Sequence, residues 1–185
     1  MSNIKLRDYQ EAAVNDVRAE FRAKNDPVLF VLATGGGKTY TFSYIADSAA
    51  LAAKNVPANE YIFIIVHRKE LLLQASASLR NLGVDHGLIS PHFTQQPHKR
   101  IQVASIDTLL IRIKKRPMKA RMLIFDEAHH VVADNKWGRT YDELGKPPTL
   151  GVTATPVRTD GKGLGEHAGG IFKAMVLGPS IAELI

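Results

Sequence analysis

The sequence contains no cysteine and no long apolar run. Without cysteine the chain has no disulfide partner and no thiolate metal site, which agrees with a reducing compartment. A transmembrane helix needs about 20 mostly apolar residues, and a secretory signal needs an apolar segment near the N-terminus. Because neither pattern is present, the sequence predicts a soluble, cytoplasmic protein with no membrane partner.

Internal repeats and low-complexity tracts are also missing. The 185 residues, 45% of them hydrophobic, suit one globular domain with a sizeable core. The formal net charge is +6. Such a charge favours a polyanionic partner, because lysines and arginines that neutralise phosphates release counterions. Nucleic acid is therefore an expected partner.

A glycine-rich segment, ATGGGKT at 33–39, has the composition of a phosphate-binding loop. A triphosphate needs several backbone N–H donors close to it, and glycine lets the backbone approach without a Cβ. Lys38 would reach the β and γ phosphates, and Thr39 would offer a hydroxyl to Mg²⁺. An apolar run before the loop and a helical pattern after it predict strand, loop and helix. The residues expected to bind nucleotide here are Thr34, Gly35, Gly36, Gly37, Lys38 and Thr39.

One position departs from the general phosphate-loop pattern. The pattern G-x-x-x-x-G-K-[ST] has a glycine where this chain has Leu32. The alternative to a nucleotide site is a glycine-rich turn between a strand and a helix that happens to end in Lys-Thr. The second motif of the chain bears on this choice.

That second motif is DEAH at 126–129, directly after the apolar run 121–125. The run predicts a strand, and ligands of open α/β sheets bind at the carboxyl ends of strands. Asp126 is expected to hold Mg²⁺, and Glu127 to orient and deprotonate the attacking water. The alternative is an acidic helix start, since both residue types favour a first turn. With Lys38, the two carboxylates are the catalytic candidates.

The two motifs together resemble the first RecA-like domain of a superfamily 2 helicase or translocase of the DEAH type. The resemblance covers nearly the whole chain and implies a P-loop NTPase with ATP and Mg²⁺ as cofactors. Alternating strands and helices predict the matching α/β fold, a mostly parallel sheet with helices on both faces. Residues 1–178 are expected to form this domain, and 179–185 to begin a linker. The linker would lead to a second RecA-like domain, absent here, whose arginines stabilise the transferring phosphoryl group.

A short element near the N-terminus, LRDYQ at 6–10, resembles the adenine-reading element of that superfamily. Gln10 would pair with the adenine edge, because an amide offers a donor and an acceptor together. Arg7 would contact the base. As an alternative, Tyr9 and Gln10 belong to an amphipathic helix that runs to about Lys24.

Two segments resemble the nucleic-acid motifs of the superfamily. In the first, HRKEL at 67–71, Arg68 is expected to contact backbone phosphates, and a solvated helix start is the competing interpretation. In the second, Ser105 and Thr108 are expected to hold a nucleic-acid strand through their hydroxyls. Capping of the following helix would also explain them.

A segment with two threonines, LGVTATP at 150–156, resembles the T-A-T element that couples hydrolysis to nucleic-acid binding. In the family its hydroxyls face the DEAH motif. His129, paired with Thr153 or Thr155, would therefore link the nucleotide to the bound strand. Arg158 follows this element and is expected to contact nucleic acid or the domain interface.

Several other side chains have no assigned role. The densest basic cluster lies between a predicted helix and the DEAH strand, which places it at the amino ends of the strands, opposite the nucleotide. We interpret it as a solvated turn, with a partner-protein surface as the alternative. Trp137 is expected to be either a partly buried lid residue or a contact residue, and His86 to lie in a solvated loop. The cluster comprises Arg112, Lys114, Lys115, Arg116, Lys119 and Arg121.

Three functions compete at this point. The resemblance favours an ATP hydrolase that is stimulated by nucleic acid, DNA more than RNA, and that translocates on it or remodels it. This chain would hold the ATP-binding half and hydrolyse weakly or not at all alone. A stand-alone nucleotide-binding or interaction module is the alternative. A small-molecule kinase is disfavoured, because it requires neither the Asp126-Glu127 pair nor the T-A-T element.

Overall fold

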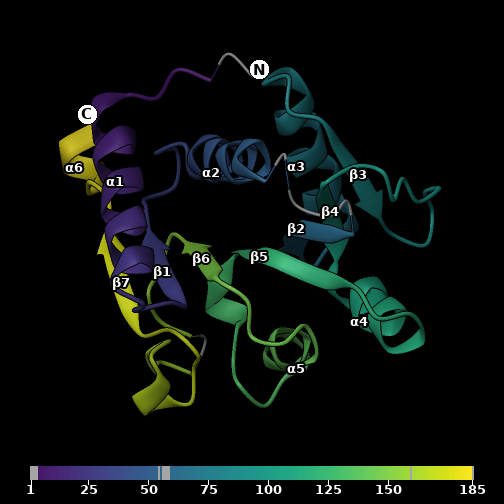
Figure 1. The fold of residues 1–185 in the computed structure, drawn as a ribbon. Helices are drawn as coiled ribbons and strands as arrows, with labels where there is room; N and C mark the ends of the chain where they lie inside the picture. The colour runs from purple at the N-terminus through teal and green to yellow at the C-terminus, as the bar shows by residue number, and fades with distance from the viewer. Residues whose placement is uncertain (1–3, 54, 56–58, 159, 185) are drawn as a thin grey trace.

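The structure is a computed structural model that describes residues 4–53, 55, 59–158 and 160–184. Across this described part, seven strands form one sheet in the order β3-β4-β2-β5-β6-β1-β7, and every pairing is parallel. Figure 1 shows helices on both faces of the sheet. The predicted α/β architecture is therefore confirmed. The strands are β1 (Val28–Val31), β2 (Glu60–Val66), β3 (His86–Ile89), β4 (Ile101–Ser105), β5 (Lys119–Asp126), β6 (Thr149–Thr153) and β7 (Ala174–Leu177).

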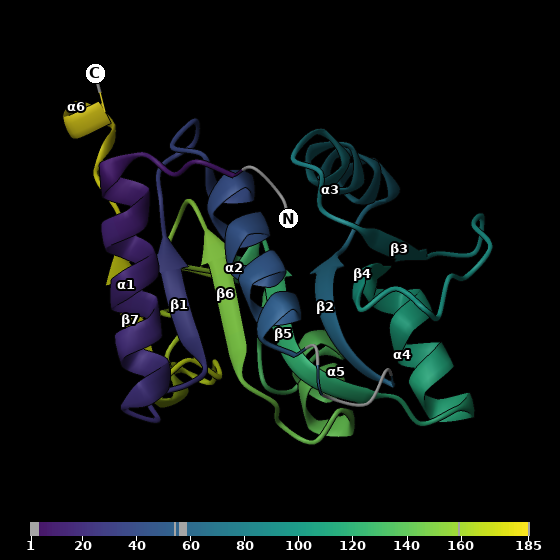
Figure 2. The ribbon, with the colours of Figure 1, turned by 45° about the horizontal axis from the view of Figure 1, so that its top comes forward.

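The helices divide between the two faces of the sheet (Figure 2). On one face lie α1, α2 and α3, and on the other lie α4 and α5, while α6 is a single turn near the C-terminus. Two 3₁₀ turns, η1 and η2, occur in the connections. The helical elements are α1 (Asp8–Arg22), α2 (Lys38–Ala52), α3 (Lys69–Asn81), α4 (Ile106–Lys115), η1 (Ala128–His130), α5 (Lys136–Glu143), η2 (Glu166–Ala168) and α6 (Ile181–Leu184).

Each face of the sheet buries its own apolar core. Along β2, Ile62 and Ile64 face the core beneath α1, α2 and α3, whereas Phe63 and Ile65 face the core on the opposite side. Successive side chains of a strand point to opposite faces, so a strand covered on both faces reads as a continuous apolar run. This is why the central strands were evident from the sequence.

All strands point the same way, so their carboxyl ends meet along one edge of the sheet. Strand β6 lies between β5 and β1, with Asp126 beside Val152 and Val31 beside Thr153 in the register. The glycine-rich loop leaves β1 at this edge, and the DEAH residues leave β5 there. The topology therefore brings the two sequence motifs together.

One feature differs from expectation. His86 begins β3 rather than lying in a solvated loop, and its ring nitrogens lie 2.8 Å from Ser76 Oγ and 2.8 Å from the Val84 carbonyl oxygen. Since a carbonyl only accepts, Nδ1 of His86 donates to Val84 and Nε2 accepts from the serine hydroxyl.

Among the helices of the described residues, none combines the length and the apolar content that a bilayer crossing requires.

Candidate nucleotide site

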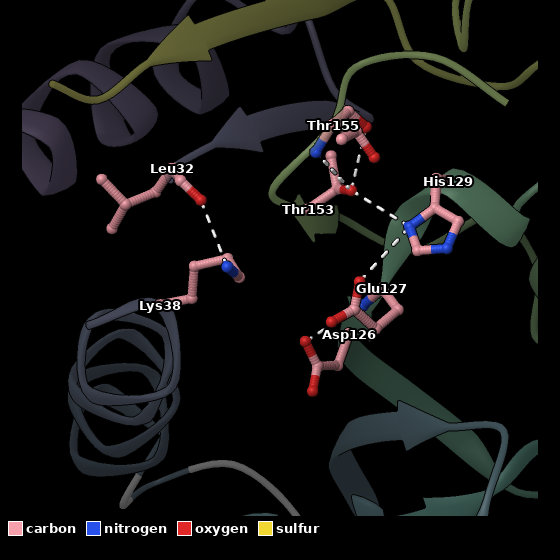
Figure 3. A network of polar contacts seen from close by, with 7 residues as sticks. All are labelled: Leu32, Lys38, Asp126, Glu127, His129, Thr153 and Thr155. Atoms are coloured by element: carbon pink, nitrogen blue, oxygen red, sulfur yellow. Dashed lines mark hydrogen bonds and ion pairs between the residues drawn. The ribbon is translucent and has the colours of Figure 1, made fainter. Parts of the chain in front are cut away.

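The glycine-rich loop has the backbone shape that its sequence predicts. Gly35 and Gly37 both have positive φ, 84° and 82°, a region that favours glycine. Gly37 is the N-cap of α2, so the partial positive charge of the helix N-terminus points into the loop. Figure 3 shows the Lys38 side chain directed towards Leu32, to whose carbonyl oxygen Nζ donates at 3.2 Å. Strand, loop and helix are thus confirmed.

Leu32, the departure from the general pattern, packs beneath this loop. Its side chain is 1% exposed. A Cβ added at Gly36 would lie 2.8 Å from Leu32 Cγ, which is closer than carbon atoms normally approach. Leu32 therefore packs directly against the loop at Gly36.

The start of α1 closes one side of the loop. Tyr9 donates its hydroxyl to the Gly36 carbonyl oxygen at 3.0 Å, and Gln10 Nε2 donates to the same oxygen at 3.4 Å. The other end of the Gln10 amide accepts from Arg7 N at 3.0 Å. A cavity of about 300 Å³ lies here. Its lining residues are Lys5, Arg7, Tyr9, Gln10, Gly35, Gly37 and Tyr40.

This arrangement refines the interpretation of the N-terminal element. Gln10 is 4% exposed and belongs to the helix, as the alternative had it, yet it also lines the cavity beside the loop. Tyr9 and Tyr40 were not predicted as site residues. Tyr9 was visible within the LRDYQ element, whereas only tertiary packing reveals Tyr40.

The DEAH residues occupy the carboxyl end of β5. Asp126 accepts from the Glu127 backbone N–H at 3.0 Å. Burial and the neighbouring Glu127 charge raise the pKa of the Asp126 carboxyl to about 6, against the opposing effects of that N–H and of Lys38. Glu127 has φ 53°, an uncommon value for a residue with a side chain. This backbone turn directs its carboxylate towards His129 (Figure 3).

A second cavity, of about 410 Å³, contains both residues expected to hold Mg²⁺. Thr39 from α2 and Asp126 from β5 line it together with Gln74 and Ser78 from α3. Hydroxyl and carboxylate oxygens are the ligands that Mg²⁺ prefers. Within the described part of the chain, no three His, Cys, Asp or Glu side chains converge as a metal-binding group. The donor set therefore fits an ion that takes its other ligands from water and phosphate.

A hydrogen-bonded chain joins the DEAH segment to the T-A-T segment. His129 Nδ1 lies 3.2 Å from Thr153 Oγ1 and 3.3 Å from Glu127 Oε2. The Thr153 hydroxyl donates to the Thr155 carbonyl oxygen at 3.0 Å, so its oxygen can only accept from His129. Nδ1 therefore carries the proton. Thr155 takes part through its backbone, whose N–H also donates to Thr153 Oγ1 at 3.2 Å.

Three rings form a cluster beside this chain of contacts. The His130 ring lies 4.6 Å from that of His67 and 6.3 Å from that of Trp137, onto which it stacks. Burial lowers the pKa of His67 and that of His130. Trp137 is 3% exposed and packs on Phe125 in the core. The expectation of a lid or contact role for Trp137 is therefore wrong, because the fold uses this side chain as core.

The residues expected to contact nucleic acid separate into two groups. Arg68 is exposed at the start of α3, and Ser105 is near it, since Val66 pairs with Ser105 in the register. Thr108 follows, half-buried, in the first turn of α4. Ser105 is the N-cap of α4 but makes no side-chain cap hydrogen bond, so capping does not occupy its hydroxyl.

Arg158 is the exception. Its side chain is buried, Nη2 donates to the Ala168 carbonyl oxygen at 2.8 Å, and Nε pairs with Asp160 at 3.2 Å. The guanidinium holds the turn that follows β6 and is not directed to solvent. In this chain the Arg158 guanidinium is held by Asp160 and Ala168, and the expected contact to nucleic acid or to a domain interface stays a prediction.

Fold and site together define a RecA-like P-loop NTPase domain. The family model described as "Type III restriction enzyme, res subunit" matches residues 3–158. The chain belongs to this family and is the first RecA-like domain of a superfamily 2 helicase or translocase.

Individual relatives agree with this assignment. IRC3 of Saccharomyces cerevisiae, which carries the name of an ATP-dependent helicase, is 34% identical over 170 residues, covering 86% of this chain and 24% of that protein. "DNA 3'-5' translocase XPB2" of Sulfurisphaera tokodaii is 32% identical over 160 residues, covering 86% of this chain and 33% of that protein. The UvsW helicase structure from bacteriophage T4 shares the fold, with TM-score 0.73 and 16% identity, over 96% of this chain and 62% of that one. The chain thus spans a quarter to a third of the length of the two sequence relatives.

Proposed function

We propose that this chain is the ATP-binding half of a nucleic-acid-dependent ATPase that couples Mg-ATP hydrolysis to translocation on, or remodelling of, DNA. One observation carries the proposal. The phosphate-loop residues and the DEAH carboxylates lie at the same edge of the sheet, and Glu127 is joined through His129 to Thr153. Such a chain links a hydrolytic site to a neighbouring segment that could respond to a bound strand.

At the nucleotide, each residue has a distinct task. Loop N–H groups and Lys38 would hold the phosphates, with Lys38 exchanging its bond to Leu32 for a phosphate oxygen. Thr39 and Asp126 would hold Mg²⁺, which when bound would neutralise developing charge on the phosphates. Glu127 would orient and deprotonate the attacking water, and the His129 N–H would fix its carboxylate. Arg7 and Gln10 would contact the base from the cavity beside the loop.

The nucleic acid would follow the carboxyl edge of the sheet. Arg68, Ser105 and Thr108 would contact its backbone, and His129 with Thr153 and Thr155 would transmit the state of the nucleotide site. Support for DNA over RNA comes from the relative named as a DNA translocase and from the family description, which names a restriction enzyme subunit.

The domain organisation belongs to the same proposal. Residues 1–178 would form the domain and 179–185 the start of a linker to a second RecA-like domain; residues 1–3 and 185 lie outside the described residues. The second domain would complete the active centre with arginines, so this chain alone would hydrolyse ATP weakly. The cytoplasmic location expected from the sequence stays a prediction.

The test is ATP turnover by the protein that carries both domains, with and without duplex DNA or RNA. We expect stimulation by DNA, and a loss of about a hundredfold or more in Lys38→Ala, because the loop then has no cation for the phosphates. Lys173→Ala, which removes an exposed lysine away from the loop, is the matched control. Turnover that ignores both nucleic acids would refute the coupling. If this chain alone hydrolysed ATP as fast as the longer protein, the proposal that it holds only half of the active centre would be refuted.

A further inference from the structure

A concave surface lies at the opposite end of the sheet from the nucleotide site. It lies between the C-terminal end of α4, the start of β5 and the segment before β4, and it encloses about 640 Å³. We call it the basic groove. Four cationic side chains line it: Arg112, Lys115, Arg116 and Lys119.

The positive charge of the basic groove is largely uncompensated. Lys115, Arg116 and Lys119 are exposed, and no carboxylate in the described part of the chain forms an ion pair with them. Arg112 is held in place, donating to Gln95 Oε1 at 3.0 Å and to the Ser90 carbonyl oxygen at 3.4 Å. Like charges around one concavity raise the local potential and attract an anionic group. A solvated turn would require no such concavity.

The floor of the basic groove is apolar and fixed. Tyr61 and Met118 are half-buried and pack against the core on that face of the sheet. The Tyr61 hydroxyl donates to the Pro97 carbonyl oxygen at 3.1 Å, and its ring lies 5.6 Å from that of Phe63. An aromatic ring held at both ends is a preformed contact surface that costs little conformational entropy to bind.

From this combination we infer that the basic groove binds an acidic peptide segment with one apolar anchor residue, supplied by a partner protein. Carboxylates would pair with the rim, and the anchor would cover Tyr61 and Met118. A nucleic-acid duplex offers phosphates on a convex surface but no apolar group for the floor. It would therefore pair with the cationic side chains of the basic groove and leave Tyr61 and Met118 without a partner. The inference does not depend on the proposed ATPase activity, because the groove and the nucleotide site lie at opposite ends of the strands.

The test measures fluorescence anisotropy of a labelled, glutamate-rich peptide with one central leucine, added to this chain. We expect Lys115→Glu and Arg116→Glu to weaken binding by about tenfold or more, since each places like charge against the peptide. Lys114→Glu makes the same charge change on the same helix outside the groove, and we expect less than about twofold. Lys115→Gln gives a milder change if charge reversal disturbs folding.

A second comparison tests the floor. Met118→Gln should weaken the leucine peptide about fivefold and leave a peptide with serine in place of leucine within about twofold, because only the leucine buries apolar area. Equal losses in Lys114→Glu and Lys115→Glu would overturn the inference. So would the absence of peptide binding, or a DNA duplex that displaces the peptide and loses affinity in the same variants.

Discussion

Asp126 should destabilise the folded domain at neutral pH, so Asp126→Asn should be more stable than the wild type. The carboxyl has an ordinary pKa of 3.8 and a folded pKa of about 6. Because the pKa is higher in the folded state, the carboxyl stabilises the fold when it is protonated, and this stabilisation is lost as the pH rises through 6. The difference between the two pKa values corresponds to a loss of about 3 kcal/mol in the free energy of unfolding at pH 8. Asparagine is neutral and keeps an oxygen for the Glu127 N–H.

Urea unfolding followed by circular dichroism measures this effect. We expect Asp126→Asn to raise the free energy of unfolding by about 3 kcal/mol at pH 8 and by about 1 kcal/mol at pH 4.5, where the wild-type carboxyl is largely protonated in the folded state. Asp16→Asn, an exposed change on α1, should stay within about 0.5 kcal/mol at both pH values. A gain that is the same at both pH values, or no gain at pH 8, would refute burial of charge as the cause.

Two further predictions concern the packing around the site. Trp137→Ala should lower the free energy of unfolding by roughly 3–5 kcal/mol in urea titrations, because it leaves a cavity against Phe125. Leu51→Ala, on the exposed side of α2, should lower it by less than about 1 kcal/mol. A loss for Trp137→Ala as small as for Leu51→Ala would show that the Trp137 ring is not part of the core. Gly37→Ala should weaken binding of a fluorescent Mg-nucleotide about tenfold or more, because the new Cβ would overlap the Gln10 amide as well as strain a positive φ. Gly83→Ala is the control, because Gly83 has a similar φ of 70° but no atom near the added Cβ. If Gly37→Ala kept its nucleotide affinity and lost only as much stability as Gly83→Ala, overlap with Gln10 would not affect binding.

The sequence was sufficient for the parts of the fold that local patterns determine. Strands buried on both faces read as apolar runs, so the runs that form β1 and most of β5 were predictable. The edge strands β3 and β7 were not, because each has only four residues: β3 mixes polar and apolar residues, and β7 is apolar but exposes Met175 and Leu177. Helix α5 was missed because its segment is mostly polar, and only the sheet beneath it shows that Trp137 is buried.

The candidate site shows the same division. The motifs and the strand pattern predicted that Lys38 and Asp126 lie at one edge of a parallel sheet, and the family resemblance added His129. Spacing did not reveal that Tyr9 hydrogen-bonds to the loop. It also did not reveal that the Arg158 guanidinium donates to Ala168 and pairs with Asp160. Those outcomes depend on which partner a flexible side chain reaches after folding, and a one-dimensional pattern contains no such information.

Leu32 also connects the nucleotide loop to a distant part of the chain. Its Cδ1 would lie 2.9 Å from a Cβ at Gly36 and 2.6 Å from a Cβ at Gly178, directly after β7. The chain leaving β7 is tied to the same place, since Gly178 N donates to the Val31 carbonyl oxygen at 2.8 Å. Packed interiors transmit displacement because they resist compression. If the loop binds phosphate as proposed and shifts on binding, Leu32 would carry that displacement to the segment that leaves the last strand of the sheet.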